Sequence, residues 1–328
     1  MVDCECIWEP EGEEGGENAS LREFESLSNL NTLEINIKDV ECLPRIPLFS
    51  KLTKYSISIG YDDDDKFFGA KHVTSFGNNL KLRSSRTIPL ECVNSLLRSS
   101  AVLELRGMGS EDAVQELFRE GIEGLQHLKD LVIEDCATPE CFVNTMEWVP
   151  CTPNAISPIF PILEKLEFVD LPNLRKICHC QLPTGSFGKL KHLDIYNCDK
   201  IEEVIWNEKV EDDATNKMEF LALESMTLWN LPMLVGFCRG TGEIEFPQLK
   251  KLSLGRLPQL KWLFLNSNNP FSESMENHNA TFVSLFPHKV ALPSLEELEL
   301  EDLDNLEGLE HIPISMCSFS KLKKLHVN

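Results

Sequence analysis

The chain has 328 residues, 42% of them hydrophobic, and 53 acidic against 31 basic residues give it a formal charge of -22. This charge opposes binding to nucleic acid or to an anionic membrane, and it favours a basic ligand or partner. The sequence contains no apolar run near the roughly 18 residues of a membrane span and no basic, apolar signal peptide at its start. Twelve cysteines are too dilute for a disulfide scaffold, so we expect a reducing, cytoplasmic setting.

The N-terminal residues 1–20 contain the run EPEGEEGGEN, which is acidic and rich in glycine. Such a composition cannot bury enough apolar surface to fold, so we expect a flexible segment. A repeated apolar pattern follows and continues to the end of the sequence. We therefore predict one elongated repeat domain over residues 21–328.

The pattern is clearest in two copies, FPILEKLEFVDLPNLRKI from Phe160 and FGKLKHLDIYNCDKIEEVI from Phe187. Both follow LxxLxLxx(L/C)xx(L/I)xx(I/V), which is the signature of a leucine-rich repeat. The step of two in LxL is typical of a strand, and the steps of three suit a tight turn or a 3₁₀ segment. One copy cannot bury its own apolar face, so neighbouring copies must stack.

The second apolar residue of each LxL marks about eleven repeats along the chain. These markers are Ile35, Ile57, Leu82, Leu105, Ile133, Phe168, Ile195, Leu228, Leu254, Leu300 and Val327. Most are spaced as this repeat class requires. Three longer intervals indicate insertions near 136–158, 207–217 and 266–289, and loops of this length are often functional or mobile.

These observations predict an α/β solenoid, a leucine-rich-repeat horseshoe. A curved parallel β-sheet would line its concave face, and mostly irregular or 3₁₀ legs would form its convex face.

Several stretches carry a family resemblance. They are FPILEKLEFVDLPNLRKICHCQL (160–182), SFGKLKHLDIYNCDKIEEVI (186–205), LESMTLWNLPMLVGFC (223–238), FPQLKKLSLGRLPQLKWLF (246–264) and LSNLNTLEINIKDVECLP (27–44). They resemble the leucine-rich-repeat region of plant intracellular immune receptors, and more narrowly the coiled-coil, nucleotide-binding disease-resistance proteins. The FPxLExLxLxxLPNLxxI form and the ICHxQL tail are typical of that group.

The resemblance implies a sensing and autoinhibitory module for plant defence. Its partners would be a pathogen effector, a guarded host protein, or the receptor's own nucleotide-binding domain. No coiled coil or nucleotide-binding domain is found in the sequence. The nearest run to a phosphate-binding loop, GSFGKL at 185–190, is too short and lacks the hydroxyl that would hold magnesium. An ATP or ADP site would therefore lie outside this sequence, and we expect no cofactor.

Enzymatic signatures are absent from the sequence. Cys178, His179 and Cys180 could suggest a metal site, but alternate residues of an extended segment point to opposite faces. Cys136 and Cys198 fall at the position after the strand where this repeat class places Asn or Cys for structural reasons. No histidine is fixed beside a cysteine, and no pair of acids stands out for acid–base chemistry. We expect no catalytic or metal-binding residue.

The strand residues that flank each buried Leu pair should line the concave face, where a protein partner would bind. These candidates are Lys54, Lys81, Arg83, Arg106, Lys165, Glu167, His192, Asp194, Tyr196, Thr227, Trp229, Glu297, Glu299 and Glu301. They run from basic to acidic along the chain, with Tyr196 and Trp229 on neighbouring strands. Exposed Trp and Tyr are enriched at binding hot spots, although a lone aromatic often packs on its neighbour instead.

Two other functions fit a repeat array. One is a stand-alone adaptor or decoy, and the other is a substrate-recruiting subunit of a ubiquitin ligase. The second would need an F-box before the repeats, and residues 1–26 are too short and too acidic for one. The sequence does not identify the recognised effector or host protein, or the role of the insertions.

Overall fold

The computed structural model describes residues 8–10, 18–61, 77–84, 88–108, 124–136, 140–144, 158–179, 185–206, 220–240, 246–266, 292–303 and 319–328. The chain divides into two compact units, Met1–Ala137 and Thr138–Asn328. Most of the predicted flexible segment and of the three predicted insertions lies outside the described residues. The single repeat domain predicted from residue 21 stays a prediction.

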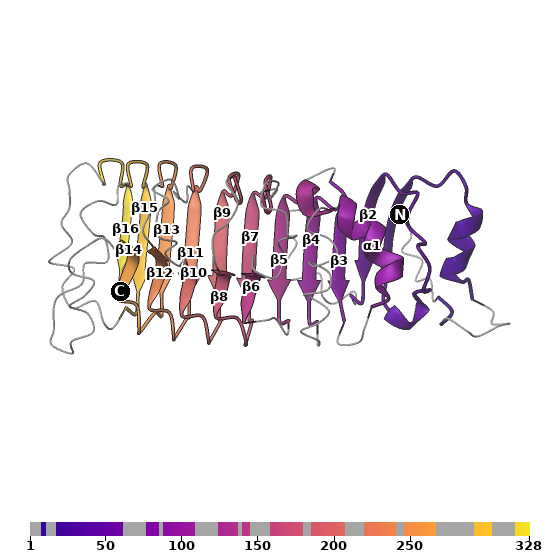
Figure 1. The fold of residues 1–328 in the computed structure, drawn as a ribbon, viewed down its shortest axis with the longest axis horizontal. Helices are drawn as coiled ribbons and strands as arrows, with labels where there is room; N and C mark the ends of the chain where they lie inside the picture. The colour runs from indigo at the N-terminus through magenta and orange to yellow at the C-terminus, as the bar shows by residue number, and fades with distance from the viewer. Residues whose placement is uncertain are drawn as a thin grey trace, which may run out of the picture. The chain divides into compact units, whose positions relative to one another are not determined.

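The first unit contains parallel strands that pair in chain order (Figure 1). They are β1 (Thr32–Ile37), β2 (Lys54–Ile59), β3 (Asn79–Arg83), β4 (Val102–Arg106) and β5 (Asp130–Glu134). A 3₁₀ turn at Leu21–Ser26 precedes β1, and 3₁₀ turns at Val40–Cys42 and Gly124–His127 and the helix α1 (Leu90–Ser99) lie between the strands. Side chains alternate between the core and the outer face along each strand. In β3, Leu80 and Leu82 are fully buried, while Lys81 between them faces outward.

The register of the first two strands corrects our sequence markers. Ile57 pairs with Leu80, and Ile59 pairs with the marker Leu82. The markers of the first two repeats, Ile35 and Ile57, are therefore two residues early. The error has a physical cause, because β1 and β2 each contain three alternating apolar residues, and a pattern of period two fits either pair.

The second unit contains two parallel sheets (Figure 1). The main sheet consists of β7 (Lys165–Val169), β9 (His192–Tyr196), β11 (Ser225–Trp229), β13 (Lys251–Gly255), β15 (Glu297–Glu301) and β16 (Lys324–Val327). The second sheet consists of β6 (Cys141–Asn144), β8 (Lys176–His179), β10 (Glu203–Trp206), β12 (Gly236–Gly240) and β14 (Trp262–Asn266). Here the legs, which we expected to be mostly irregular, include short strands that pair with one another.

The core of the second unit lies between its two sheets. From the main sheet it receives the buried pairs of the repeat, such as Leu166 and Phe168. Aromatic side chains fill it at two places, in the clusters Phe142–Phe160–Phe168 and Phe220–Phe237–Phe246. These contacts run from one repeat to the next, so each repeat depends on its neighbours for its core.

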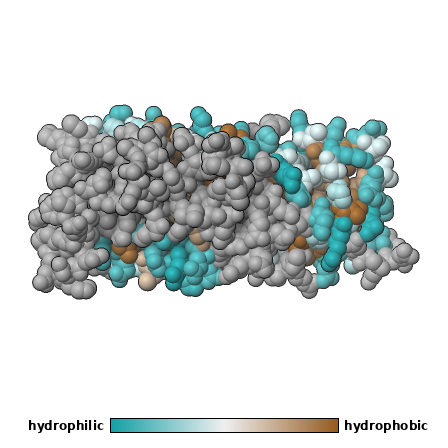
Figure 2. Space-filling view, viewed as in Figure 1, coloured by the Kyte–Doolittle hydropathy of each residue, from teal (hydrophilic) through white to brown (hydrophobic). Residues whose placement is uncertain are grey.

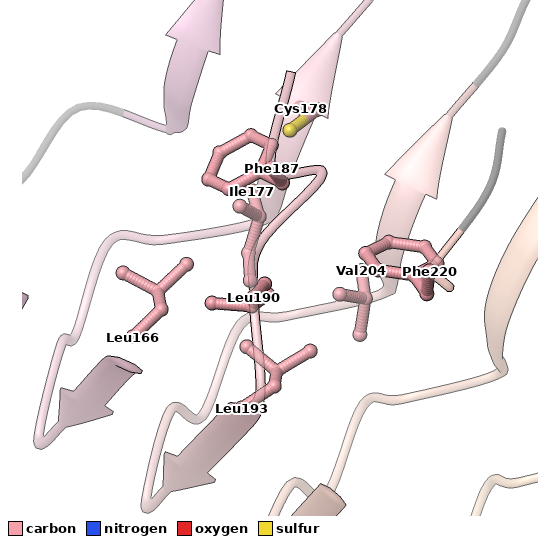
Figure 3. Close-up of a pocket in the computed structure, with 8 residues that line it drawn as sticks. All are labelled: Leu166, Ile177, Cys178, Phe187, Leu190, Leu193, Val204 and Phe220. Carbon is pink, nitrogen blue, oxygen red and sulfur yellow. The ribbon is translucent and has the colours of Figure 1, made fainter. Parts of the chain in front are cut away.

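One small apolar pocket of about 20 Å³ interrupts this core (Figure 3). Its lining consists of Leu166, Ile177, Cys178, Phe187, Leu190, Leu193, Val204 and Phe220. In the second sheet the register places Val204 beside Ile177 on one side and Phe237 on the other. Val204 is the smallest of these three side chains, which accounts for the space beside it.

The residue after most main strands adopts a left-handed backbone conformation. These residues are Gly60, Gly107, Asp135, Asp170, Asn197, Asn230, Arg256 and Asp302. Gly, Asn and Asp tolerate this conformation best, which explains their frequency here. The turn continues the ladder, since the Asn197 N–H donates to the Trp229 carbonyl at 3.1 Å and the Asn230 side chain donates to Asn197 Oδ1 at 2.9 Å.

Ion pairs of regular spacing lie just before the strands of the main sheet. Glu164 pairs with Lys191 at 2.5 Å, Glu224 with Lys250 at 2.6 Å, and Glu296 with Lys323 at 2.8 Å. In each pair the acid of one repeat meets the lysine of the next. Exposed pairs of this kind contribute little to stability, so they support the register more than they determine the fold.

Candidate functional site

The open face of the second unit, meaning the side of the main sheet turned away from the core, presents three rows of side chains. The amino row consists of Lys165, His192, Ser225, Lys251, Glu297 and Lys324. The middle row consists of Glu167, Asp194, Thr227, Ser253, Glu299 and His326. The carboxyl row consists of Val169, Tyr196, Trp229, Gly255 and Glu301. Every site residue that we predicted in this unit lies in these rows.

The lysines of this face all stand in the amino row, and each reaches an acid. Lys165 pairs with Glu167 at 2.7 Å and Lys251 with Glu299 at 3.4 Å. Lys324 pairs with Glu297 at 2.5 Å, and this bond lowers the pKa of the Glu297 carboxyl. The middle and carboxyl rows themselves contain four acids and no lysine or arginine, so they form an acidic band.

Asp194, like the other three acids of this band, is partly buried. Burial raises the pKa of its carboxyl, the hydrogen bond from Thr227 opposes that effect, and the nearby Glu167 adds to it. Burial also raises the pKa of the Tyr196 hydroxyl, which interacts with the same Thr227. Within the described residues, neither Asp194 nor Glu301 has a cation at ion-pair distance.

Trp229 packs on the neighbouring strand, as one of our two alternatives predicted. Its six-membered ring lies against Gly255, where an added Cβ would be 2.3 Å from the ring. The guanidinium of Arg256 is 5.9 Å from the ring centroid, and its Nε is 3.6 Å from an oxygen of Asp302. Trp229 nevertheless remains partly exposed, so packing and partner binding are compatible.

The first unit places its predicted cations differently. Lys81 and Arg106 both pair with Glu104, at 2.8 and 2.5 Å, and Glu104 is only 7% exposed. Arg106 also reaches Glu134 at 3.1 Å, and the Tyr61 hydroxyl donates to Glu104 at 3.3 Å. Two of the predicted cations therefore neutralise a buried carboxylate.

The other two predicted cations of the first unit do not pair with Glu104. Arg83 stands over the Tyr61 ring at 6.0 Å, and Lys54 is exposed opposite Thr32 of β1. Glu104, the acid that joins Lys81 and Arg106, was not among the candidate residues predicted from the sequence. The available signal was its position, since Lys81 of β3 lies opposite Glu104 in the register and Arg106 follows two residues later on the same strand.

The cysteine predictions can be compared with the structure at three positions. Cys136 and Cys198 are buried as expected, and each thiol bonds to backbone atoms of its turn. Burial raises the pKa of Cys136 to about 11 and that of Cys198 to about 12. Cys178 is buried too and pairs with Ile205 in the second sheet, whereas Cys180 lies outside the described residues.

No group of three or more potential metal ligands occurs within the described ranges. The helices among those ranges include none that is long and apolar enough to cross a membrane. Hydrophilic side chains cover much of the described surface visible in Figure 2, with small apolar groups among them. The open face of the second unit combines the neighbouring side chains of Tyr196 and Trp229 with an acidic band.

Parallel strands, left-handed Asn or Asp turns and short legs around a leucine core define a leucine-rich-repeat protein. Residues 109–206 and 158–270 match the family described as plant disease resistance protein RPS2-like, leucine-rich repeats. The chain's repeats are therefore of the kind found in plant disease-resistance proteins, as the sequence motifs predicted.

One curated relative is the disease resistance protein RGA2 of Solanum bulbocastanum. It is 26% identical over 168 residues, which amounts to 50% of this chain. The aligned region covers 15% of the relative's own length. No solved structure is significantly similar to the chain.

Proposed function

We propose that the chain is the non-catalytic recognition module of a cytoplasmic plant immune receptor. It would sense a pathogen effector or a guarded host protein and would help to hold the receptor's nucleotide-binding domain in the resting state. The family match and the relative support a role in disease resistance. The observation that carries the proposal is the open face of the second unit, with Tyr196 and Trp229 side by side.

The size and chemistry of this face suit a protein partner. Six neighbouring strands at about 4.8 Å span roughly 25 Å, which is wider than a metabolite requires. Trp and Tyr are the residue types enriched at interface hot spots, and both are only partly buried here. The surrounding charges favour a partner of complementary charge and would speed its association.

The thiols support a role without chemistry. A cysteine nucleophile reacts as the thiolate, so a reactive cysteine has a lowered pKa. Burial shifts Cys136 and Cys198 in the opposite direction, to about 11 and about 12. Both therefore stay protonated at neutral pH, as structural residues do.

Charge reversal of Glu297, Glu299 and Glu301 in the intact receptor tests the autoinhibitory part of this function. We expect the triple Lys variant to trigger cell death in leaf tissue without a pathogen, because the resting contact would be repelled. A matched control reverses Glu25, Glu41 and Glu140, which are exposed and lie outside the rows of the open face. Unchanged autoinhibition in the first variant, at equal protein level, would count against the proposal.

A further inference from the structure

The middle and carboxyl rows of β9, β11 and β13 form a block on the open face of the second unit. It consists of Asp194, Tyr196, Thr227 and Trp229, with Gly255 beside the indole. The Thr227 hydroxyl joins the first two, because both Asp194 and Tyr196 interact with it. The block is therefore held together before any partner arrives.

The Trp229 side chain packs against Gly255 of the neighbouring strand, where no side chain blocks it. The indole occupies the space that a side chain at position 255 would need, and Gly255 is buried beneath it. A side chain that is already ordered loses little conformational entropy on binding. Trp229 is thus a preorganised aromatic surface.

Apolar exposure at the same end of β11 extends this surface. Met233, three residues after the left-handed Asn230, is 50% exposed. In the two adjacent repeats the residue at the same place is polar, Lys200 or Gln259. Met and aromatic residues are enriched in protein interfaces, so this repeat has the composition of an interface centre.

The charges around the block define the partner. The lysines of the open face stand in the amino row and are paired, whereas Asp194 of the middle row and Glu301 of the carboxyl row have no cation at ion-pair distance among the described residues. Arg256 shows that a guanidinium can be held here, between the Trp229 ring and the Asp302 carboxylate. A cation over an indole gains from the ring quadrupole, and a neighbouring carboxylate adds to that gain.

We propose that this block accepts an arginine or lysine side chain of a protein partner, with the cation over Trp229, next to Glu301 and in the electrostatic field of Asp194, whose strand β9 lies three strands from β15. The inference rests on the proposed function and specifies the chemistry of its partner. A basic segment of the receptor itself and a basic segment of an effector would share this chemistry.

A binding measurement with the purified full chain tests the inference. The probe is a fluorescent peptide of alternating glycine and arginine, and a peptide of alternating glycine and glutamate serves as the control probe. Fluorescence anisotropy should show binding of the arginine peptide and none of the glutamate peptide. Equal binding of both peptides would overturn the inference.

Two double variants distinguish binding at this site from the general attraction between the arginine peptide and a chain of net charge -22. We expect Asp194→Asn with Glu301→Gln to weaken binding of the arginine peptide at least about fivefold. Glu25→Gln with Glu34→Gln removes two exposed charges from the first unit and should change binding less than about twofold. Equal weakening by the two double variants would overturn the inference.

Trp229→Ala tests the aromatic part, and we expect a loss of about two- to fivefold at unchanged circular dichroism. If this variant unfolds, Trp229→Phe replaces it and should retain most of the binding, since a phenyl ring still offers an aromatic face. Full binding by a folded Trp229→Ala chain would overturn the inference. Because the receptor assay of autoinhibition is independent of the peptide, a failure here leaves the proposed function standing.

Discussion

The indole of Trp229 lies directly on Gly255 of the neighbouring strand, at a distance that leaves no room for a Cβ. Gly255→Ala should therefore displace the ring and leave the strand in place, because the clash falls on the far end of a side chain. We expect the free energy of unfolding to change by less than about 1 kcal/mol. Acrylamide quenching of tryptophan fluorescence should increase, and unchanged quenching would contradict this packing.

Gly60 illustrates the opposite case. It has a φ of +78°, and a Cβ there would be 1.7 Å from the carbonyl oxygen of Arg83, which is backbone and cannot move aside. We expect Gly60→Ala to destabilise the first unit by about 3 kcal/mol or more. Gly107→Ala is the matched control, because Gly107 is also left-handed but has only Arg83 Cγ nearby, at 4.0 Å. It should cost about 1 to 2 kcal/mol in urea unfolding, and equal losses would contradict the close contact.

The pocket beside Val204 gives a prediction for the core of the second unit. Val204→Ile adds one methylene next to a space of about 20 Å³ and should stabilise the chain by up to about 0.8 kcal/mol. Val204→Ala enlarges the same space and should cost about 2 kcal/mol. Thermal unfolding of both variants measures the difference. A loss of stability in the Ile variant would mean that the pocket cannot accept the added group.

The raised pKa of Asp194 predicts a stability that depends on pH. Its carboxylate is less favourable in the folded chain than in the unfolded chain, so the destabilisation grows as pH rises through the folded pKa, above the ordinary 3.8. Asp194→Asn should therefore stabilise the chain at pH 7, by less than about 1 kcal/mol. The gain should vanish below the ordinary pKa, where the acid is protonated in both states.

Glu297→Gln serves as the control of opposite sign. The bond to Lys324 lowers the pKa of Glu297, so its contribution is present above the ordinary 4.5 and is lost as pH falls through the folded value. This variant should be less stable than the wild type at pH 7. Urea unfolding at several pH values compares the two, and a shared sign would contradict the assignment of their environments.

Substitutions at a core position and at a surface position of adjacent strands should differ strongly in their effect on folding. Phe168 is fully buried, and Phe168→Asp would place an unpaired charge in the core at a cost of several kcal/mol. Tyr196→Ala should leave folding nearly intact, because Tyr196 points to the open face. Circular dichroism of the two variants decides the point, and melting of the Tyr196 variant would show that the strand register is wrong.

Much of the fold could be predicted because two features of the repeat indicate the same strands. These are the alternation of period two and the regular spacing of the leucines that become buried. The marker residues of the strands from β3 onward agree with the observed pairing within each unit. The pattern failed at Ile35 and Ile57, where a third apolar residue made two registers equally good. It also did not predict the second sheet, because whether a short leg becomes a strand depends on its neighbours.

The sequence predicted which residues lie on the open face better than it predicted which of their side chains contact one another. Alternation placed Tyr196 and Trp229 side by side, but the contact of Trp229 with Gly255 depends on the absence of a side chain one strand further on. Similarly, the sequence suggested a basic surface around Lys81 and Arg106. Their shared partner, Glu104, emerged only when the register placed all three side chains together.

The most direct test of the central claim, that the open face of the second unit recognises a protein, uses the intact receptor in leaf tissue. Tyr196→Ala with Trp229→Ala should abolish pathogen-triggered cell death or release it without a pathogen, at unchanged protein level. Leu27→Ala, a control at an exposed apolar residue of the first unit, should behave as the wild type. If the double variant keeps both a silent resting state and a full response, the open face is not the recognition surface.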